Sequence, residues 1–396
     1  MGEQRVFKPS SAADLGDLVA DTARKGAALQ IRGGGSKAAI GAPAEVPILD
    51  MSAFAGVVDY DPTELVLTIG AATLLSEVQA LVAAEGQMLA FDPFDHGPLL
   101  GRPEGRATLG GVIAAGVSGS RRVARGAARD HLLGFKAVSG RGEAFVAGGK
   151  VVKNVTGFDL SKLVVGSWGR LVALTELTLK VVPRGRAETT LVFDNLGGEA
   201  ARAVMTRAMR APAEVCATAH VPAPLNNGSA VTALRLEGFA PSVAARAKWL
   251  MELLSQYGAA HAISREESEV FWRSVRDVSP LANAPVLWRI GVPPHQGMAV
   301  GVKLDEAGAR WLADWAGGLV WAAFEGDPAT VRGLAAAAGG HAFLLRAPAA
   351  MRAAVPAFHP ESPGIQAISE RVRRAFDPDR VFESKRFADG THADRI

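Results

Sequence analysis

Two glycine-rich segments carry the clearest chemical signal in this chain. The first, Arg32-Gly33-Gly34-Gly35-Ser36-Lys37, follows a short apolar run. The second is Thr108-Leu109-Gly110-Gly111-Val112-Ile113-Ala114-Ala115-Gly116. Because glycine has no Cβ atom, the backbone of such segments can adopt positive φ and bring its N–H groups close to phosphate oxygens. Two such loops, far apart in sequence, could line one pyrophosphate from both sides, which favours a large dinucleotide as ligand.

Neither segment matches a common nucleotide motif. The first lacks the Gly-Lys-Ser/Thr ending of a P-loop. The chain also has no Gly-x-Gly-x-x-Gly turn between a strand and a helix with an acidic residue ~20 positions later. Two alternatives stay open from the residues alone. The first segment could be a flexible surface turn, and the second could serve close helix packing through small residues.

Candidate catalytic side chains are few. His96, in Asp95-His96-Gly97, could contact the bound ligand or a substrate, or it could be a solvated loop histidine, and His131 follows Asp130 in a similar neighbourhood. His341 lies on an apolar run and is typical of a structural histidine. The sequence therefore assigns no catalytic residue. No pair of histidines or of histidine and carboxylate has the spacing of metal ligands, so no metal site is predicted.

A basic run contains Arg121, Arg122, Arg125 and Arg129. It is either a solvated loop or a source of positive potential that attracts carboxylate substrates and acidic partner surfaces.

Composition excludes several classes of protein. The chain has 396 residues, 48% of them hydrophobic and 21% charged, which is typical of a folded protein with two or three domains. The single cysteine, Cys216, excludes an intrachain disulfide and an iron–sulfur cluster held by this chain's own thiolates. A net charge of only +3 argues against nucleic-acid binding. No apolar stretch approaches the ~18 residues of a membrane helix, and the N-terminus has no apolar signal core. We therefore expect a cytoplasmic protein.

Periodicity predicts the elements around the glycine loops. Residues 28–32 form a strand that leads into the first loop, and residues 171–182 form a strand with alternating apolar and polar positions. Pro183-Arg184-Gly185-Arg186 marks a domain boundary. Beyond it, a helix at 198–210 and several strands predict an α+β domain with an antiparallel sheet and helices on one side. We predict domains at 1–183 and 184–350, followed by a C-terminal helix and tail at 351–396.

Longer motifs make the interpretation specific. They are Arg32 to Ser36, Asp92-Pro93, Ala107 to Gly111, Gly119 to Gly126, Arg129-Asp130 and Gly148 to Ser161, with weaker likeness at Trp288-Arg289 and Gly339 to Ala342. With these motifs the chain resembles the PCMH-type FAD-binding domain shared by vanillyl-alcohol oxidase and p-cresol methylhydroxylase. Within that superfamily it most resembles the smaller flavin-binding subunits of bacterial glycolate oxidases. The likeness is strong over residues 28–183.

The resemblance implies an α+β fold, with a two-subdomain PCMH-type FAD-binding domain followed by an α+β cap domain with an antiparallel sheet. It also implies FAD as cofactor. It assigns cofactor contacts to Arg32, Gly33, Gly34, Gly35, Ser36, Lys37, Pro93, Thr108, Leu109, Gly110, Gly111, Ile113, Ala114, Gly166, Ser167, Gly169 and Val172.

The implied function is oxidation of glycolate to glyoxylate within a complex. The implied partners are a larger flavoprotein subunit and an iron–sulfur subunit, which would accept the electrons. The substrate would be a small 2-hydroxy acid, and the protein would meet the inner face of the membrane only through its partners. The alternatives are a stand-alone FAD-dependent 2-hydroxy-acid or alcohol dehydrogenase, and a non-catalytic FAD-binding scaffold.

Four departures from the family pattern refine these expectations. Ser36 stands where covalent flavoproteins often carry histidine, so we expect non-covalent FAD. Val172 replaces the last glycine of the Gly166-Ser167-Trp168-Gly169 motif. The tail Phe382-Glu383-Ser384-Lys385-Arg386-Phe387 replaces an Asn-Pro-Gly-type ending, which puts a flavin contact from the tail in doubt. The histidine-rich element of related hydroxy-acid dehydrogenases is absent, which favours dependence on partners.

Overall fold

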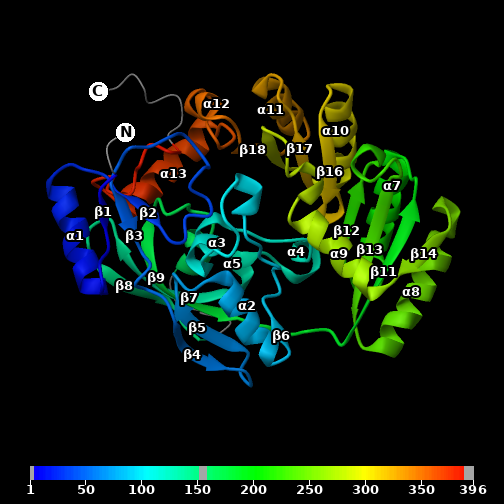
Figure 1. Cartoon of the computed structure of the whole chain (residues 1–396), viewed down its shortest axis with the longest axis horizontal. Helices are drawn as coiled ribbons and strands as arrows, with labels where there is room; N and C mark the ends of the chain where they lie inside the picture. The colour runs from blue at the N-terminus through cyan, green and yellow to red at the C-terminus, as the bar shows by residue number, and fades with distance from the viewer. Residues whose placement is uncertain (1–3, 151–157, 388–396) are drawn as a thin grey trace. The chain divides into compact units, whose positions relative to one another are not determined.

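The computed structural model describes residues 4–150 and 158–387. The chain folds as two compact units. Unit 1 comprises Met1–Ser118, Gly126–Pro183 and Pro360–Ile396, and unit 2 comprises Gly119–Arg125 and Arg184–His359 (Figure 1). The division into domains at 1–183, 184–350 and 351–396 stays a prediction. Residues 151–157, part of the motif that ends at Ser161, lie outside the described residues.

Unit 1 contains the elements that follow, in chain order. They are β1 (Val6–Phe7), α1 (Ala12–Arg24), β2 (Gln30–Arg32), β3 (Ile48–Asp50), β4 (Val57–Asp61), β5 (Val66–Gly70), α2 (Leu75–Ala84), β6 (Gln87–Met88), the 3₁₀ turn η1 (Pro98–Leu100), α3 (Leu109–Ala115), α5 (Ala128–His131), β7 (Leu132–Ser139), β8 (Ala144–Gly148), α6 (Leu160–Val164), β9 (Val172–Lys180), β10 (Val182–Pro183) and α13 (Pro363–Phe376).

Two sheets make up most of unit 1. Strands β1, β3 and β2 form a parallel sheet in the order β1-β3-β2, and an antiparallel sheet has the order β4-β5-β9-β7-β8. The predicted alternation of β9 is confirmed, because Leu177, Leu179 and Val181 are fully buried. The strand predicted at 28–32 is also confirmed as β2, which leads directly into the first glycine loop.

The C-terminal tail packs into unit 1. The carboxylate of Asp377 accepts hydrogen bonds from the N–H groups of Val381 and Phe382, each at 2.8 Å. Val381 and Phe382 join the buried cluster that includes Leu15 and Leu49. The carbonyl of Val381 also accepts a hydrogen bond from the N–H of Leu29, 2.7 Å away, at the start of β2. The tail is therefore held beside the strand that precedes the glycine loop.

Unit 2 contains a larger set of elements. They are α4 (Arg122–Arg125), β11 (Ala187–Asp194), α7 (Gly198–Arg210), β12 (Val215–Val221), η2 (Ala223–Leu225), β13 (Val231–Gly238), α8 (Ala240–Leu254), η3 (Ser255–Tyr257), β14 (Ala260–Ile263), α9 (Arg265–Arg276), η4 (Ser279–Leu281), β15 (Leu287–Gly291), α10 (Pro294–Glu306), β16 (Arg310–Asp314), η5 (Trp315–Gly317), β17 (Leu319–Ala323), α11 (Pro328–Ala337), β18 (His341–Arg346) and α12 (Ala349–Ala354).

The strands of unit 2 form one eight-stranded antiparallel sheet, in the order β14-β11-β13-β12-β16-β17-β15-β18. One face of the sheet shares a core with α7, α8, α10 and α11. Helix α9 packs on the other face. Thr190 lies on β11 next to the core residue Leu191, so its side chain points away from that core. Trp272 Nε1 of α9 donates a hydrogen bond to Thr190 Oγ1 at 2.8 Å. The predicted antiparallel sheet is confirmed, but the expectation that its helices lie on one side is wrong for α9.

Candidate cofactor site

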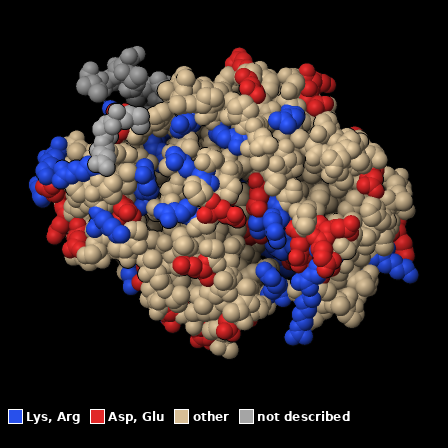
Figure 2. Space-filling view, viewed as in Figure 1, with Lys and Arg blue, Asp and Glu red and all other residues tan. Residues whose placement is uncertain are grey.

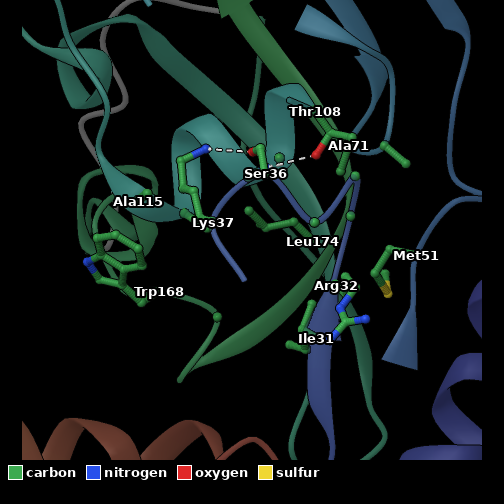
Figure 3. Close-up of a pocket in the computed structure, with 18 of the residues that line it drawn as sticks. Ile31, Arg32, Ser36, Lys37, Met51, Ala71, Thr108, Ala115, Trp168 and Leu174 are labelled. Atoms are coloured by element: carbon green, nitrogen blue, oxygen red, sulfur yellow. Dashed lines mark hydrogen bonds between the residues drawn. The ribbon is translucent and has the colours of Figure 1, made fainter. Parts of the chain in front are cut away.

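A cavity in unit 1 lies beside the first glycine loop (Figure 3). The loop contributes one wall, α3 contributes another, and the start of β9 contributes a third. The predicted residues that line it are Arg32, Gly33, Gly34, Gly35, Ser36, Lys37, Thr108, Gly110, Gly111, Ala114, Gly169 and Val172. The two glycine segments, 76 positions apart between Arg32 and Thr108, therefore meet at one cavity, as the sequence predicts.

The other predicted residues do not line this cavity. Leu109 and Ile113 are fully buried on the inner side of α3. Gly166 donates its N–H to the carbonyl of Ile113 at 3.1 Å, and Ser167 donates to Val164 at 3.2 Å. The carbonyl of Pro93 accepts a hydrogen bond from Gln79 Nε2 at 3.1 Å. These five residues therefore lie outside the lining of the cavity.

Sequence reasoning missed several residues of the cavity wall. Met51, Ala71, Ala115, Trp168, Leu174 and Arg386 line it, among others. Arg386 comes from the tail, and its guanidinium donates hydrogen bonds to the carbonyls of Lys37 at 2.8 Å and Ile40 at 2.7 Å. The ring of Phe387 lies 5.3 Å from that of Trp168. The altered tail is thus part of the cavity wall. The only sequence signal for these missed residues was at Trp168, which lies inside the motif Gly166-Ser167-Trp168-Gly169.

The glycines of the loop are required by close packing. A Cβ atom on Gly34 would overlap the carbonyl oxygen of Arg106 and lie 2.7 Å from its carbon. A Cβ atom on Gly33 would lie 2.5 Å from Thr108 Oγ1. Gly35 adopts a φ of 77°, which favours glycine. The first loop therefore lies directly against the segment that leads into the second.

The loop offers unused hydrogen-bond donors, but α3 does not. Among the described residues, the N–H groups of Gly34, Gly35 and Ser36 donate no hydrogen bond. The first N–H groups of α3 are already used, because Leu109 donates to Thr73, Gly110 donates to Ala71, and Gly111 donates to the hydroxyl of its N-cap, Thr108. Successive unused N–H groups form an anion-binding concavity. The unused backbone donors beside the cavity therefore lie on the first loop, whereas the first N–H groups of α3 are taken up within the protein.

The charges around the loop are mostly positive. Burial lowers the pKa of Lys37 to about 8, and the nearby carboxylate of Asp95 counteracts this only in part. A second cavity shares Arg32, Gly33 to Ser36 and Thr108 with the first. Its charged lining residues are Lys8, Arg32, Arg102, Arg106 and one carboxylate, Asp50. Figure 2 shows Lys and Arg side chains gathered on unit 1 between β2 and α3. Both cavities therefore suit an anionic ligand.

The histidines singled out from the sequence lie elsewhere. His96 is buried and stacks on Phe94 with 4.4 Å between ring centroids, and His131 is buried 5.6 Å from the ring of Phe91. Neither lines the two cavities beside the loop. His341 lies in unit 2 at the start of β18, where burial lowers its pKa.

The basic run belongs largely to unit 2. Arg121 forms a 2.6 Å ion pair with Glu237, and both side chains are buried. Ser120 donates a 2.7 Å hydrogen bond to Asp314, and the guanidinium of Arg122 lies 4.1 Å from the ring centroid of Trp315. Arg122, Arg125 and Arg129 are exposed, and the Arg129 side chain is 63% exposed. The segment 119–125 is thus bound into unit 2 by buried polar contacts, and Arg121 fits neither alternative drawn from the sequence.

Comparison with known proteins identifies the family. The family model described as an FAD binding domain matches residues 4–148. Glycolate oxidase subunit GlcE of Escherichia coli (strain K12) is 33% identical over 364 residues, which cover 90% of this chain and 92% of that protein. The chain belongs to the GlcE family. It is therefore an FAD-dependent oxidoreductase subunit with a PCMH-type fold, and FAD is its cofactor.

One further relative and one solved structure are also similar to this chain. D-lactate dehydrogenase of Archaeoglobus fulgidus is 30% identical over 189 residues, or 48% of this GlcE-family chain and 41% of that enzyme. A solved structure of alkyldihydroxyacetonephosphate synthase has a TM-score of 0.66 at 15% identity and covers 95% of this chain and 76% of that chain. This last likeness shows that the two proteins share a fold.

The described residues offer neither a membrane-spanning helix nor a metal-binding cluster. In residues 4–150 and 158–387, no helix is long and apolar enough to cross a membrane. Within the same ranges, no group of three or more histidine, cysteine or acidic side chains is arranged to hold a metal ion.

Proposed function

We propose that this chain is the FAD-binding subunit of a glycolate oxidase complex, in which glycolate is oxidised to glyoxylate and the electrons pass through flavin to an iron–sulfur subunit. The observation that carries the proposal is the similarity to GlcE over 90% of the chain. A likeness confined to the cofactor-binding half would support only a flavoprotein. The extension of the likeness through unit 2 supports the specific subunit.

We further propose where the residues of unit 1 hold FAD. The unused N–H groups of Gly34, Gly35 and Ser36 bind the diphosphate at the loop that both cavities share. The adenosine lies in the first cavity, beside Trp168 and Val172. The flavin ring lies toward the second cavity, where Arg102 and Arg106 supply positive potential that favours the anionic reduced ring.

The redox chemistry itself is two-electron oxidation of an alcohol, which FAD supplies when bound. Glycolate loses two electrons and two protons to become glyoxylate, and these electrons require an onward acceptor. This chain has one cysteine, Cys216, and burial raises the pKa of its thiol far above the usual range. A cluster ligated by several thiolates must therefore reside on another subunit, which supports an iron–sulfur partner. A larger flavoprotein subunit completes the proposed complex.

The test is reconstitution with partners. The chain is co-expressed with a larger flavoprotein and a cysteine-rich subunit, and the complex is purified through a tag on this chain. We expect all three to co-purify and to reduce an artificial dye with glycolate. The isolated chain is expected to reduce the dye slowly or not at all. Full glycolate oxidation by the isolated chain, or failure of the three proteins to associate, would contradict the proposal.

A second candidate rests on the D-lactate dehydrogenase match over 48% of the chain. In that case the isolated chain would act as a stand-alone FAD-dependent 2-hydroxy-acid dehydrogenase. D-lactate offered to the isolated chain in the same dye assay distinguishes the two candidates. Turnover of D-lactate without partners would favour the second.

A further inference from the structure

Arg289 lies on the face of the unit 2 sheet that is opposite to the main core. Its neighbours on β15, Trp288 and Ile290, belong to the core cluster, so the alternation of the strand directs Arg289 to the other face. The side chain is partly buried there. Among the described residues it forms no hydrogen bond and no ion pair. A guanidinium in such a place normally pairs with an acid, because an unpaired charge is costly to remove from water.

The groups beside Arg289 are aromatic or cationic. Its guanidinium lies 5.1 Å from the ring centroid of Trp315, and the guanidinium of Arg122 lies 4.1 Å from the same centroid. Burial and the charge of Arg122 lower the pKa of Arg289 to about 10, which leaves it protonated at neutral pH. The ring of His341 packs on Gly291 of β15, where an added Cβ atom would lie 2.8 Å from Cε1. Like charges at this spacing repel each other, so an anion between the two arginines would stabilise both.

Hydrogen bonds fix the positions of the aromatic ring and of the second arginine. Trp315 has a φ of 54°, a left-handed conformation that bulky residues rarely adopt and that is often retained at binding sites. The two oxygens of Asp314 accept hydrogen bonds at 2.7 Å from the N–H of Trp315 and from the hydroxyl of Ser120. The indole Nε1 donates to the carbonyl of Gly119 at 2.9 Å. The turn that carries Trp315 is therefore bound to the segment that carries Arg122.

We propose that Arg289 and Arg122, beside the ring of Trp315, form a binding site in unit 2 for the carboxylate of a small acid. A planar guanidinium presents parallel N–H donors that match the two oxygens of a carboxylate. The nitrogen atoms of Arg289 are not sealed from solvent, so a small anion can reach them. Arg289 stands within the sheet, because β15 lies between β17 and β18, which favours a small acid over the side chain of a docked protein. The inference rests on the proposed function for the identity of the acid, which is then glycolate or its product, glyoxylate.

The experiment measures the binding of glycolate to the isolated full chain by ligand-observed NMR, with glycolamide as the neutral counterpart. For the wild type we expect saturable binding of glycolate and no binding of glycolamide, which lacks the carboxylate. Arg289→Met should weaken glycolate binding by about tenfold or more, because charge-assisted hydrogen bonds are lost. Arg122→Met should weaken it as well. Arg210→Met removes an exposed arginine in the last turn of α7 and should keep the wild-type affinity.

Thermal unfolding separates a binding role of Arg289 from a structural one. Without ligand, Arg289→Met should unfold at the wild-type temperature or above it, since the change removes a cation that no described residue neutralises. A lower unfolding temperature together with unchanged glycolate binding would show that Arg289 only supports the fold, and would overturn the inference. If Arg289→Met does not fold, as judged by circular dichroism, Arg122→Met decides, because wild-type glycolate affinity in that variant would reject the shared site.

The complex of the three subunits tells whether the bound acid is the substrate. We expect Arg289→Met to raise the KM for glycolate while the partners still co-purify. A variant with wild-type KM that loses its partners would show that an acidic side chain of a partner occupies the site, which would contradict the inference. Failure of the wild-type chain to bind glycolate would reject the site and leave the proposed function standing if the complex still oxidises glycolate. A complex without glycolate oxidation would reject the proposed function, whereas glycolate binding through Arg289 would still support the site.

Discussion

Gly111 offers a way to separate cofactor binding from folding. It lines the first cavity on α3 and has ordinary helical φ, so alanine fits its backbone. An added Cβ atom would lie 3.3 Å from Thr108 Oγ1 and 3.9 Å from Lys37 Nζ, which requires only a small adjustment. Alanine also favours helix over glycine by about 1 kcal/mol. We therefore expect Gly111→Ala to be as stable as the wild type, or more stable.

The same methyl group would occupy space that the diphosphate needs. An extra methyl in a tightly packed site costs about 1 to 3 kcal/mol, which corresponds to an FAD affinity reduced about 5- to 150-fold. Thermal unfolding without FAD measures the first effect, and fluorescence titration with FAD measures the second. Gly333→Ala makes the same change in α11, where an added Cβ atom meets nothing within 4 Å, and should leave FAD affinity unchanged. Wild-type FAD affinity in Gly111→Ala would refute the placement of the diphosphate.

Three further changes test the rest of the structure. Gly34→Ala should lower both FAD affinity and the free energy of unfolding, the latter by about 2 to 4 kcal/mol, because the new methyl overlaps Arg106; calorimetry with and without FAD measures both. Burial lowers the pKa of His220 to about 4, so the free energy of unfolding of the wild type falls as the pH drops below 6.5. Between pH 7 and pH 4.5, the free energy of unfolding of His220→Gln, measured by urea titration, should fall by about 2 to 3 kcal/mol less than that of the wild type. Arg121→Met removes one of the two arginines that pair with buried Glu237 and leaves Arg235 at 3.2 Å, so it should cost about 1.5 to 3 kcal/mol in chemical denaturation, and an unchanged midpoint would contradict the ion pair.

Local sequence patterns predicted much of unit 1. Alternation placed Leu177 and Leu179 in the core of β9, and the glycine spacing predicted a loop at the end of β2. Both features depend on neighbours in sequence. The meeting of the two loops at one cavity was also predicted, first because two glycine segments could line one pyrophosphate and then because the family resemblance linked them; periodicity alone cannot relate segments so far apart.

Features set by distant contacts were not predictable in this way. Asp377 holds the turn of the tail that precedes Arg386. Arg386 then bonds to Lys37 on the first glycine loop, which is 349 residues away in sequence. The reason for Gly34 is the carbonyl of Arg106, which no local pattern reveals. The basic run reads as exposed, yet Glu237 lies opposite Arg121 in the fold. In each case the role of the residue depends on a partner that is distant in sequence and is brought close by the tertiary structure.

The most direct test of the account is the state of the flavin in the purified chain. The protein is expressed, its visible absorbance is recorded, and it is then precipitated with acid. Because Ser36 stands where a histidine would attach flavin, we expect flavin absorbance in the native protein and release of intact FAD into the supernatant. A pellet that stays yellow would contradict the non-covalent site, and a chain that takes up no flavin even when incubated with FAD would contradict the central claim.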